Sequence, residues 1–397
     1  MATVHTVDGR LIICASSKVF SIVDSQGVLD IRETFDVKNA STSAPKPNKC
    51  SEANSNVKQN NGSEDPSYQV LCCAVSNCGT MLAIGTSEKT AMILNSKSLQ
   101  MRRAFRIPKA PTSVCFDKDD SHIIIGDRAG HVICYTVEPS EKSGYVDMNG
   151  EECPYEGEPL TSAISMVLDV AISHDGRFLL AADRDEKIRV SRYPQAFVVQ
   201  SFCLGHSAYV SSVAVHGHRV FSTGGDSIVH EWNIETGKSV AKSDKLDEVP
   251  VRRICLLPKV QDEKFNIVAI SGNKLHILNE KLQEIRSVDA SSAIMDVSVL
   301  EENVYCVSSS GVFSFNVAEG TLKSLTVTND LIEALSNAKD PISNYFKNVT
   351  HQNMVDYYKR KAEKIESIKE KQNRKRKAKE ERRKAEKRLA GEAEVTC

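Results

Sequence analysis

The chain has 397 residues, a length that suggests two or three ordinary domains unless the sequence repeats. Apolar residues make up 41% and charged residues 26%, a balance that excludes wholesale disorder and a fibrous chain. The formal net charge of −1 hides an asymmetry: residues 359–388 hold 16 Lys and Arg against 6 Glu, whereas residues 1–358 carry a net charge of −9. A basic tail on an acidic body predicts that contact with an acidic polymer is localised to the tail.

The sequence carries no sign of export or of a membrane span. Met1–His5 lack the basic and apolar regions of a secretory signal, and no apolar run approaches the roughly 18 residues that a span needs. We therefore expect a soluble intracellular protein with no membrane contact. The 12 cysteines form no Cys-x-x-Cys pair, which favours buried, reduced thiols. We expect no metal site, because His216 and His218 share a strand face but lack a nearby third ligand.

From residue 70 onward the sequence repeats a pattern of short alternating strands and polar turns. Six units have their first strand starting at Cys72, Ser113, Asp169, Ser212, Arg253 and Asp296. A period near 40 to 45 residues with about four strands per unit is typical of a propeller blade. Apolar strands between Val4 and Val23 supply a seventh unit, and no helical segment separates the strands, which excludes a parallel α/β fold. The predicted fold is an all-β, seven-bladed β-propeller, closed by pairing of N-terminal and C-terminal strands because an open array would expose its edges.

The predicted organisation has three parts. Residues 1–328 form the propeller, with flexible insertions at 36–69 and 138–160. Residues 329–358 form short helical segments that pack on it. Residues 359–397 form a basic helical tail with a disordered end, because the segment contains good helix formers and too few apolar residues for a coiled coil.

One unit contains a motif that indicates the type of repeat. Gly205-His206 is followed by the strand hydroxyls Ser222 and Thr223, by Asp226, and by Trp232-Asn233. This arrangement resembles a WD repeat. The resemblance implies that His206, one of the two hydroxyls, Asp226 and Trp232 form a hydrogen-bonded network that braces the blade, a structural role and not a catalytic one.

A second segment is more specific. Leu168–Phe178 runs into Ala182–Ser191, and Ser201–His206 and Tyr209–Ser211 follow. Together these residues resemble the WD-repeat, non-catalytic subunit of tRNA (guanine-N7-)-methyltransferase. In that family this turn binds the catalytic subunit, and the basic residue matching Arg189 pairs with an acidic group there.

The same turn can be interpreted from its chemistry. Six of the seven residues from Asp183 to Arg189 are charged in an otherwise apolar blade. Strand alternation directs Ile188 to the core and Lys187 and Arg189 away from it. Asp183 can brace the turn, and a solvated polar turn is the ordinary alternative. The partner-binding residues that we predict come from this turn and from the equivalent turn of the preceding blade: Arg128, Arg184, Asp185, Glu186, Lys187 and Arg189.

The tail offers a second candidate site. Its basic clusters would contact RNA phosphates without reading sequence, or act as a nuclear import signal, and both can hold. The clusters are Arg374, Lys375, Arg376, Lys377, Arg382, Arg383 and Lys384.

These observations favour a non-catalytic subunit that binds and stabilises the catalytic subunit for N7-methylguanosine formation in the tRNA variable loop. The chain itself would need no cofactor, with S-adenosylmethionine on the catalytic partner, tRNA bound through the complex, and a nuclear and also cytoplasmic location. An enzyme is the first rival, although no Gly-rich nucleotide loop or nucleophile motif is present. A generic propeller scaffold in ubiquitin ligation or ribosome assembly is the second, because fold alone does not determine function.

Overall fold

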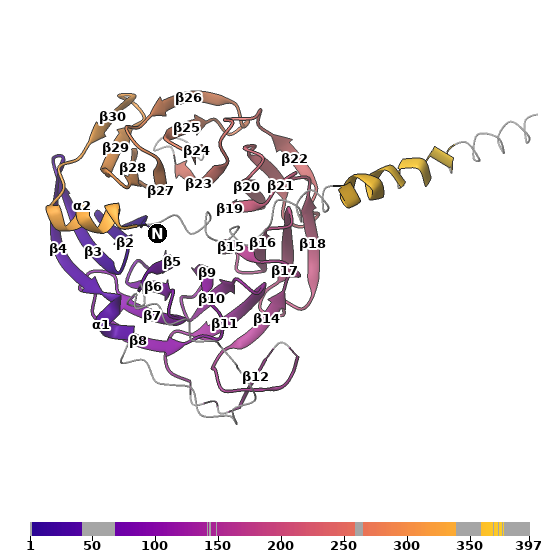
Figure 1. Cartoon of the computed structure of the whole chain (residues 1–397), viewed down its shortest axis with the longest axis horizontal. Coiled ribbons are helices and arrows are strands. Elements are labelled where there is room, and N and C mark those ends of the chain that lie inside the picture. Colours follow the sequence, from indigo (N-terminus) through magenta and orange to yellow (C-terminus); the bar gives the residue numbers. More distant parts are fainter. Residues whose placement is uncertain are drawn as a thin grey trace, which may run out of the picture. The chain divides into compact units, whose positions relative to one another are not determined.

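A computed structural model describes residues 2–41, 68–140, 142, 144–147, 149–258, 265–338, 359–367, 369–371, 373, 374 and 376. The chain divides into two units, Met1–Asp340 and Pro341–Cys397. In the first unit seven four-stranded antiparallel sheets follow one another around a ring (Figure 1). The strong alternation of the sequence thus builds a seven-bladed propeller, as predicted.

Blades 1 to 3 occupy the first part of the ring. Blade 1 contains β1 (Ala2–Val7), β2 (Arg10–Ala15), β3 (Lys18–Ser25) and β4 (Val28–Asp36), followed by the short helix α1 (Val37–Ser41). Blade 2 contains β5 (Val70–Val75), β6 (Met81–Thr86), β7 (Thr90–Asn95) and β8 (Met101–Arg106). Blade 3 contains β9 (Pro111–Phe116), β10 (His122–Asp127), β11 (His131–Thr136) and, as its outer strand, β14 (Glu158–Ser162).

Blades 4 to 7 complete the ring. Blade 4 contains β15 (Val167–Ile172), β16 (Phe178–Asp183), β17 (Lys187–Arg192) and β18 (Val199–Leu204). Blade 5 contains β19 (Val210–His216), β20 (Arg219–Gly224), β21 (His230–Asn233) and β22 (Ser239–Lys242). Blade 6 contains β23 (Val251–Pro258), β24 (Phe265–Ser271), β25 (Lys274–Leu278) and β26 (Glu284–Asp289). Blade 7 contains β27 (Ile294–Leu300), β28 (Asn303–Ser308), β29 (Gly311–Asn316) and β30 (Thr321–Ser324).

The two predicted insertions are seen only in part. Residues 42–67 of the first lie outside the described residues. The second is shorter than the predicted 138–160, because Glu158 already belongs to β14 and pairs with Cys134. Its remainder includes a small hairpin of β12 (Tyr145–Val146) and β13 (Glu152–Cys153).

Polar side chains on the inner strands connect successive blades. The backbone N–H of Val170 donates to Ser113 Oγ (3.1 Å), that of Val213 to Asp169 Oδ2 (2.8 Å), and that of Ile254 to Ser212 Oγ (3.3 Å). In each pair the acceptor belongs to one blade and the donor to the next. These acceptors are the residues at which the sequence repeat begins, so the repeat marks the contacts between blades.

The ring closes by the same kind of contact, whereas the sequence predicted closure by pairing of N-terminal and C-terminal strands. Val4 N–H donates to Asp296 Oδ2 (3.0 Å), and the other oxygen of Asp296 pairs with Arg253 Nε (3.0 Å) in blade 6. The only strand-like link between the first and last blades in the described part is one parallel bridge, Val28 to Thr326. Each blade comes from one continuous segment, so closure joins two complete sheets.

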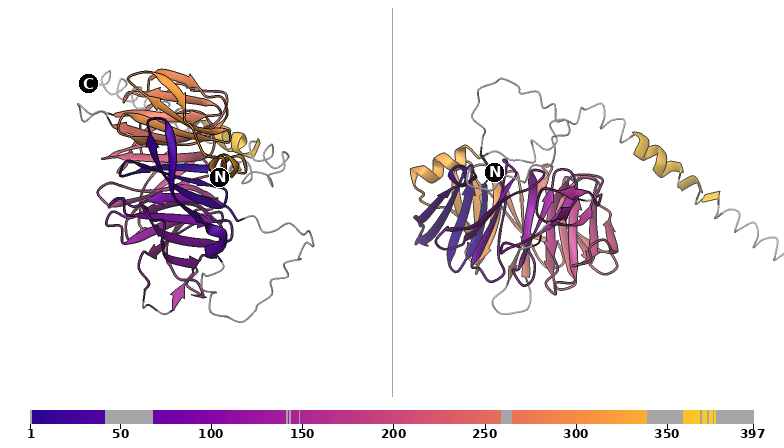
Figure 2. Two further views of the ribbon diagram at one scale, coloured as in Figure 1. Left: turned by 90° about the vertical axis from the view of Figure 1, so that its left-hand side faces the viewer. Right: turned by 90° about the horizontal axis from the view of Figure 1, so that it is seen from below.

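One helix covers the seam between blades 1 and 7. Helix α2 (Asn329–Ser336) lies beside the strands of blade 1 (Figure 2). It buries Leu331, Ala334 and Leu335 in an apolar cluster with residues of both blades. Residues 339–358, where further packed helical segments were predicted, lie outside the described residues. No helix of the described chain is both long and apolar enough to cross a bilayer.

Candidate protein-docking site

The turn between β16 and β17 is braced by a buried carboxylate. Asp183 Oδ1 accepts hydrogen bonds from the N–H groups of Asp185 (2.8 Å) and Lys187 (3.2 Å), and Lys187 Nζ lies 3.7 Å from Asp183 Oδ2. Burial raises the pKa of Asp183, and Lys187 opposes this shift. Blade 3 repeats the arrangement, since Asp127 Oδ1 accepts from Ala129 (2.8 Å) and His131 (2.9 Å). Asp183 therefore stabilises its own turn, as its position in the sequence suggested.

The rest of the turn is half-exposed. Arg184 Nε lies 3.9 Å from Asp185 Oδ1, and about a third of each side chain is exposed. Glu186 has a φ of 70°, in the left-handed region where the equivalent turn of blade 3 has Gly130. These side chains extend from a turn whose backbone is held by Asp183, so they are presented on a fixed support.

Arg128 occupies the equivalent turn of blade 3. Its N–H donates to the carbonyl of Ala110 (3.2 Å), just as the N–H of Arg184 donates to that of Met166 (3.0 Å). The Arg128 side chain is exposed. The two arginines thus follow their bracing aspartates at matching positions, and their common role in partner binding stays a prediction.

Arg189 stands out when the blades are aligned by strand register. It pairs with Ala181 on β16, and its counterparts in the other six blades are apolar or histidine. Those counterparts are Phe20, Met92, Ile133, His230, His276 and Phe313. Five of the six are buried, and Ile133 is half-buried. Blade 4 alone therefore places a permanent cation at a position that the other blades use for packing.

Among the residues that the structure describes, none neutralises the charge of Arg189. Its guanidinium donates to Ser162 O in β14 (3.1 Å, from Nη1) and to Ser191 Oγ (3.3 Å, from Nε). Burial lowers the pKa of Arg189. No carboxylate in the described part of the chain pairs with it. A partly desolvated, hydrogen-bonded but unneutralised guanidinium is suited to an acidic group on another molecule.

The neighbouring strand carries exposed apolar side chains that the sequence prediction missed. Phe202 lies opposite Arg189 across the β17–β18 ladder, and Leu204 lies opposite Lys187. They are 43% and 62% exposed, and Ile164, two residues after Ser162, is fully exposed. The sequence signal was the run Ser201–Leu204, in which Cys203 takes the core side and leaves two large apolar residues for the other face. We call Lys187, Arg189, Phe202 and Leu204 the blade 4 patch.

The predicted bracing network has a definite hydroxyl. His206 Nδ1 lies 2.8 Å from Asp226 Oδ2 and its Nε2 lies 2.7 Å from Ser222 Oγ, to which Trp232 Nε1 also donates (2.7 Å). Thr223 instead donates to the Ile228 carbonyl (3.2 Å). Because alternate residues of a strand face opposite sides, only one of two neighbouring hydroxyls can reach the histidine.

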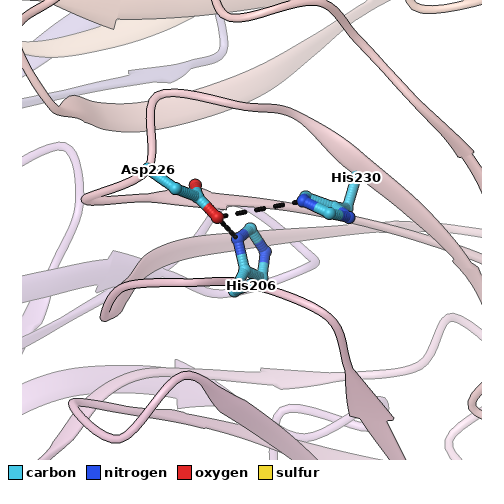
Figure 3. A group of neighbouring side chains, drawn as sticks. All are labelled: His206, Asp226 and His230. Carbon is cyan, nitrogen blue, oxygen red and sulfur yellow. Dashed lines mark hydrogen bonds and ion pairs between the residues drawn. The ribbon is translucent and has the colours of Figure 1, made fainter. Parts of the chain in front are cut away.

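The same network contains the one described group of three side chains that could hold a metal ion. Figure 3 shows His206 and His230 directed toward Asp226, and the ligand atoms of the three lie within 4.8 Å of one another. Both nitrogens of His206 already have partners, however. The two imidazole rings also lie close together, with centroids 4.2 Å apart. This packing favours bracing over coordination.

Blade 6 contains a Ser-His-Glu arrangement that resembles a catalytic triad but is buried. Ser271 Oγ lies 2.8 Å from His276 Nε2, and His276 Nδ1 lies 2.7 Å from Glu284 Oε1. This order is that of a nucleophile, its base and an orienting carboxylate. Ser271 and His276 are each 1% exposed, so no substrate can reach the hydroxyl.

The tail is described only in part. Residues 359–376, with gaps, are helical, and Arg374 and Arg376 are exposed. Arg374 Nη2 lies 3.9 Å from Glu370 Oε2, one helical turn away. The other predicted tail residues lie outside the described residues: Lys375, Lys377, Arg382, Arg383 and Lys384.

Comparison with known proteins identifies similar sequences that are named as tRNA methyltransferase subunits. The family described as the tRNA methyltransferase TRM82 WD40 domain matches residues 139–334. A Caenorhabditis elegans protein named tRNA (guanine-N(7)-)-methyltransferase non-catalytic subunit is 33% identical over 327 residues, 77% of this chain and 79% of that protein. Subunits of the same name from Kluyveromyces lactis (TRM82) and Homo sapiens (WDR4) are 30% and 28% identical. Those matches cover 60% and 48% of this chain, and 56% and 45% of the relatives.

Solved structures share the fold at low identity. A chain in the crystal structure of the mitotic checkpoint complex has a TM-score of 0.58 at 15% identity, covering 82% of this chain and 87% of that one. The WD40 propeller of Doa1 has a TM-score of 0.53 at 12% identity, covering 67% and 84%. These likenesses show a WD40 propeller. The match to the worm protein over most of both sequences shows more: the chain belongs to the family of tRNA (guanine-N7-)-methyltransferase non-catalytic subunits.

Proposed function

We propose that this chain is the non-catalytic subunit that binds the catalytic subunit of tRNA (guanine-N7-)-methyltransferase through the blade 4 patch and the adjoining turn. Arg128, Arg184, Asp185 and Glu186 complete this docking surface. The catalytic subunit supplies S-adenosylmethionine binding and the transfer of the methyl group to guanine N7 in the tRNA variable loop. Family membership favours this role over a generic scaffold in ligase or ribosome assembly.

The observation that carries the proposal is the unneutralised charge of Arg189 at a packing position. A charge held there costs desolvation energy without an ion pair in the described chain. Phe202 and Leu204 add apolar area beside it, and a mixture of apolar centre and specific charge is typical of protein interfaces. The partner surface that fits is therefore an acidic side chain flanked by apolar residues.

Arg189→Glu tests the docking site. Like charges would then face each other across the interface, so we expect the complex with the co-expressed catalytic subunit to weaken at least 100-fold and tRNA methylation to fall with it. Size-exclusion chromatography and methyl transfer to tRNA measure the two effects. The propeller should keep its thermal unfolding temperature, because in the described part of the chain the only hydrogen bonds of the Arg189 side chain are to Ser162 and Ser191.

Arg192→Glu is the matched control. It makes the same charge change in the same strand, at its other end, where Arg192 is exposed. That variant should keep both complex and activity, and the wild-type chain alone should not methylate tRNA. A stable, active complex with Arg189→Glu would remove the docking assignment, and methylation by the chain alone would restore the enzyme hypothesis.

The basic tail completes the proposal. Its exposed arginines support contact with tRNA phosphates by the assembled complex, and the same clusters support nuclear import, with some protein in the cytoplasm. Neither role needs a cofactor on this chain.

A further inference from the structure

The insertion in blade 3 walls a cavity of about 260 Å³. Ile133 and Pro159 form the side contributed by the blade, and Val146, Cys153 and Tyr155 form the side contributed by the insertion. The insertion is fixed at both ends by one guanidinium, since Arg103 of blade 2 donates to the Glu138 carbonyl (3.1 Å) and pairs with Glu156. The wall that the insertion contributes to the cavity is therefore held in place by contacts with blade 2.

Strand register places this cavity next to the docking surface. Ile133 pairs with Pro159 in blade 3 as Arg189 pairs with Phe202 in blade 4. The two sites also share β14: Pro159 lines the cavity, and the carbonyl of Ser162 accepts a hydrogen bond from Arg189. Three residues along a strand span about 10 Å, so one partner surface can reach both.

The size and chemistry of the cavity select its occupant. Sites for drug-sized ligands usually measure about 300–1,000 Å³, so this cavity suits a single side chain better than a nucleotide. Its walls are largely apolar, and its charged lining is mostly negative: Asp147 and Glu152, and Glu156 paired with Arg103, against one lysine, Lys109. An apolar side chain with a basic neighbour matches both properties.

We infer that this cavity receives an apolar side chain of the catalytic subunit, with a Lys or Arg beside it, and extends the docking surface from blade 4 to blade 3. The inference rests on the proposed function, because it takes the same partner as its occupant. An anchor residue buried in a pocket at an interface usually contributes a large part of the binding energy.

Val146→Trp tests the inference by filling the cavity from its exposed wall. Val146 is 46% exposed and lies in the insertion, so the blade cores stay untouched. We expect the dissociation constant for the catalytic subunit, measured by calorimetry, to rise at least tenfold. Val249→Trp adds the same bulk at a 47% exposed position between blades 5 and 6 and should change nothing. Unchanged affinity for Val146→Trp while Arg189→Glu still disrupts the complex would overturn the cavity alone, and unchanged affinity for both would overturn the proposed docking site as well.

A second measurement uses the wild-type chain. Cys153 lines the cavity and is half-buried, whereas Cys78 is exposed in blade 2 and serves as an internal reference. We expect the catalytic subunit to slow alkylation of Cys153 by iodoacetamide at least fivefold, measured by peptide mass spectrometry, and to leave Cys78 unaffected. Equal alkylation of Cys153 in the free chain and in the complex would contradict the inference.

Discussion

His230 lies beside the bracing network, where its Nε2 is 3.9 Å from Asp226 Oδ2, a distance too long for a hydrogen bond. Both of its ring nitrogens are buried and without a hydrogen bond in the described structure. Its ring instead stacks on Trp232, with centroids 5.1 Å apart and an interplanar angle of 8°. Burial, with a smaller effect from His206, lowers the pKa of His230 to about 4. The neutral imidazole of His230 therefore packs as an aromatic ring. Protonation of this ring destabilises the folded state.

This makes stability depend on pH in a defined direction. The pKa of His230 is about 4 in the folded chain and 6.5 in the unfolded chain, so its contribution is complete above pH 6.5 and is lost as pH falls toward 4. We expect His230→Phe, which keeps the stacking, to remove about 1 kcal/mol of the stability loss between pH 7.5 and 5.5. Urea unfolding at both pH values measures this. The control is His216→Phe, at an exposed histidine of β19, which should lose as much stability between the two pH values as the wild type. If His230→Phe also loses as much stability as the wild type, another group is responsible for the pH dependence.

At the scale of elements, β17 and β18 show how a blade combines folding with recognition. Ile188 and Val190 are fully buried, while Lys187 and Arg189 occupy the other face beside Phe202 and Leu204 of the edge strand. An exposed apolar edge invites association, and natural sheets usually protect such edges. Blade 4 has lysine and arginine next to the apolar residues, which restricts association to a partner with complementary charge.

The tail is the second element with a testable role. A chain that ends at residue 358 should bind the catalytic subunit as before, because the blade 4 patch is intact. The complex should bind tRNA more weakly, and the logarithm of its affinity should fall less steeply with the logarithm of salt concentration, since fewer phosphates lose their counterions. Fluorescence anisotropy at several salt concentrations measures the slope. An unchanged slope would leave nuclear import as the role of the tail.

At the scale of the whole molecule, the ring depends on contacts between complete blades. Asp296 is buried between Arg253 of blade 6 and the Val4 N–H of blade 1. The ion pair with Arg253 lies at the junction of blades 6 and 7, and the hydrogen bond from Val4 lies at the junction of blades 7 and 1, so one carboxylate links three blades.

Asp296→Ala should therefore destabilise the propeller. It leaves the Arg253 charge without its main partner and the Val4 N–H without an acceptor, and we expect a loss of about 3 kcal/mol in the free energy of unfolding. Asp296→Asn, which keeps an acceptor for Val4, should lose less. Urea unfolding gives both values, and limited proteolysis should release blade 1 first. Equal stability of Asp296→Ala and wild type would show that the contacts of Asp296 do not help to close the ring.

Much of the fold and part of the site could be predicted from local pattern. Period, alternation and turn residues predicted seven blades, and the position of Asp183 after a strand predicted its bracing of the turn. The sequence left Ser222 and Thr223 as alternatives, because a motif does not say which strand face meets the histidine. Phe202 and Leu204 were missed, because an apolar residue in an edge strand has the same local pattern whether it is covered or exposed.

The sequence by itself determined the repeat, the acidic body with its basic tail, and the family, because these depend on composition and on residues close along the chain. Only the tertiary structure decided that Arg189 occupies a packing position shared by seven blades, that Asp296 joins the last blade to the first, and that the insertion walls a cavity beside the docking surface. The physical reason is that each of these depends on residues far apart in sequence, such as Val4 and Asp296, whose meeting is set by strand register and by the closure of the ring.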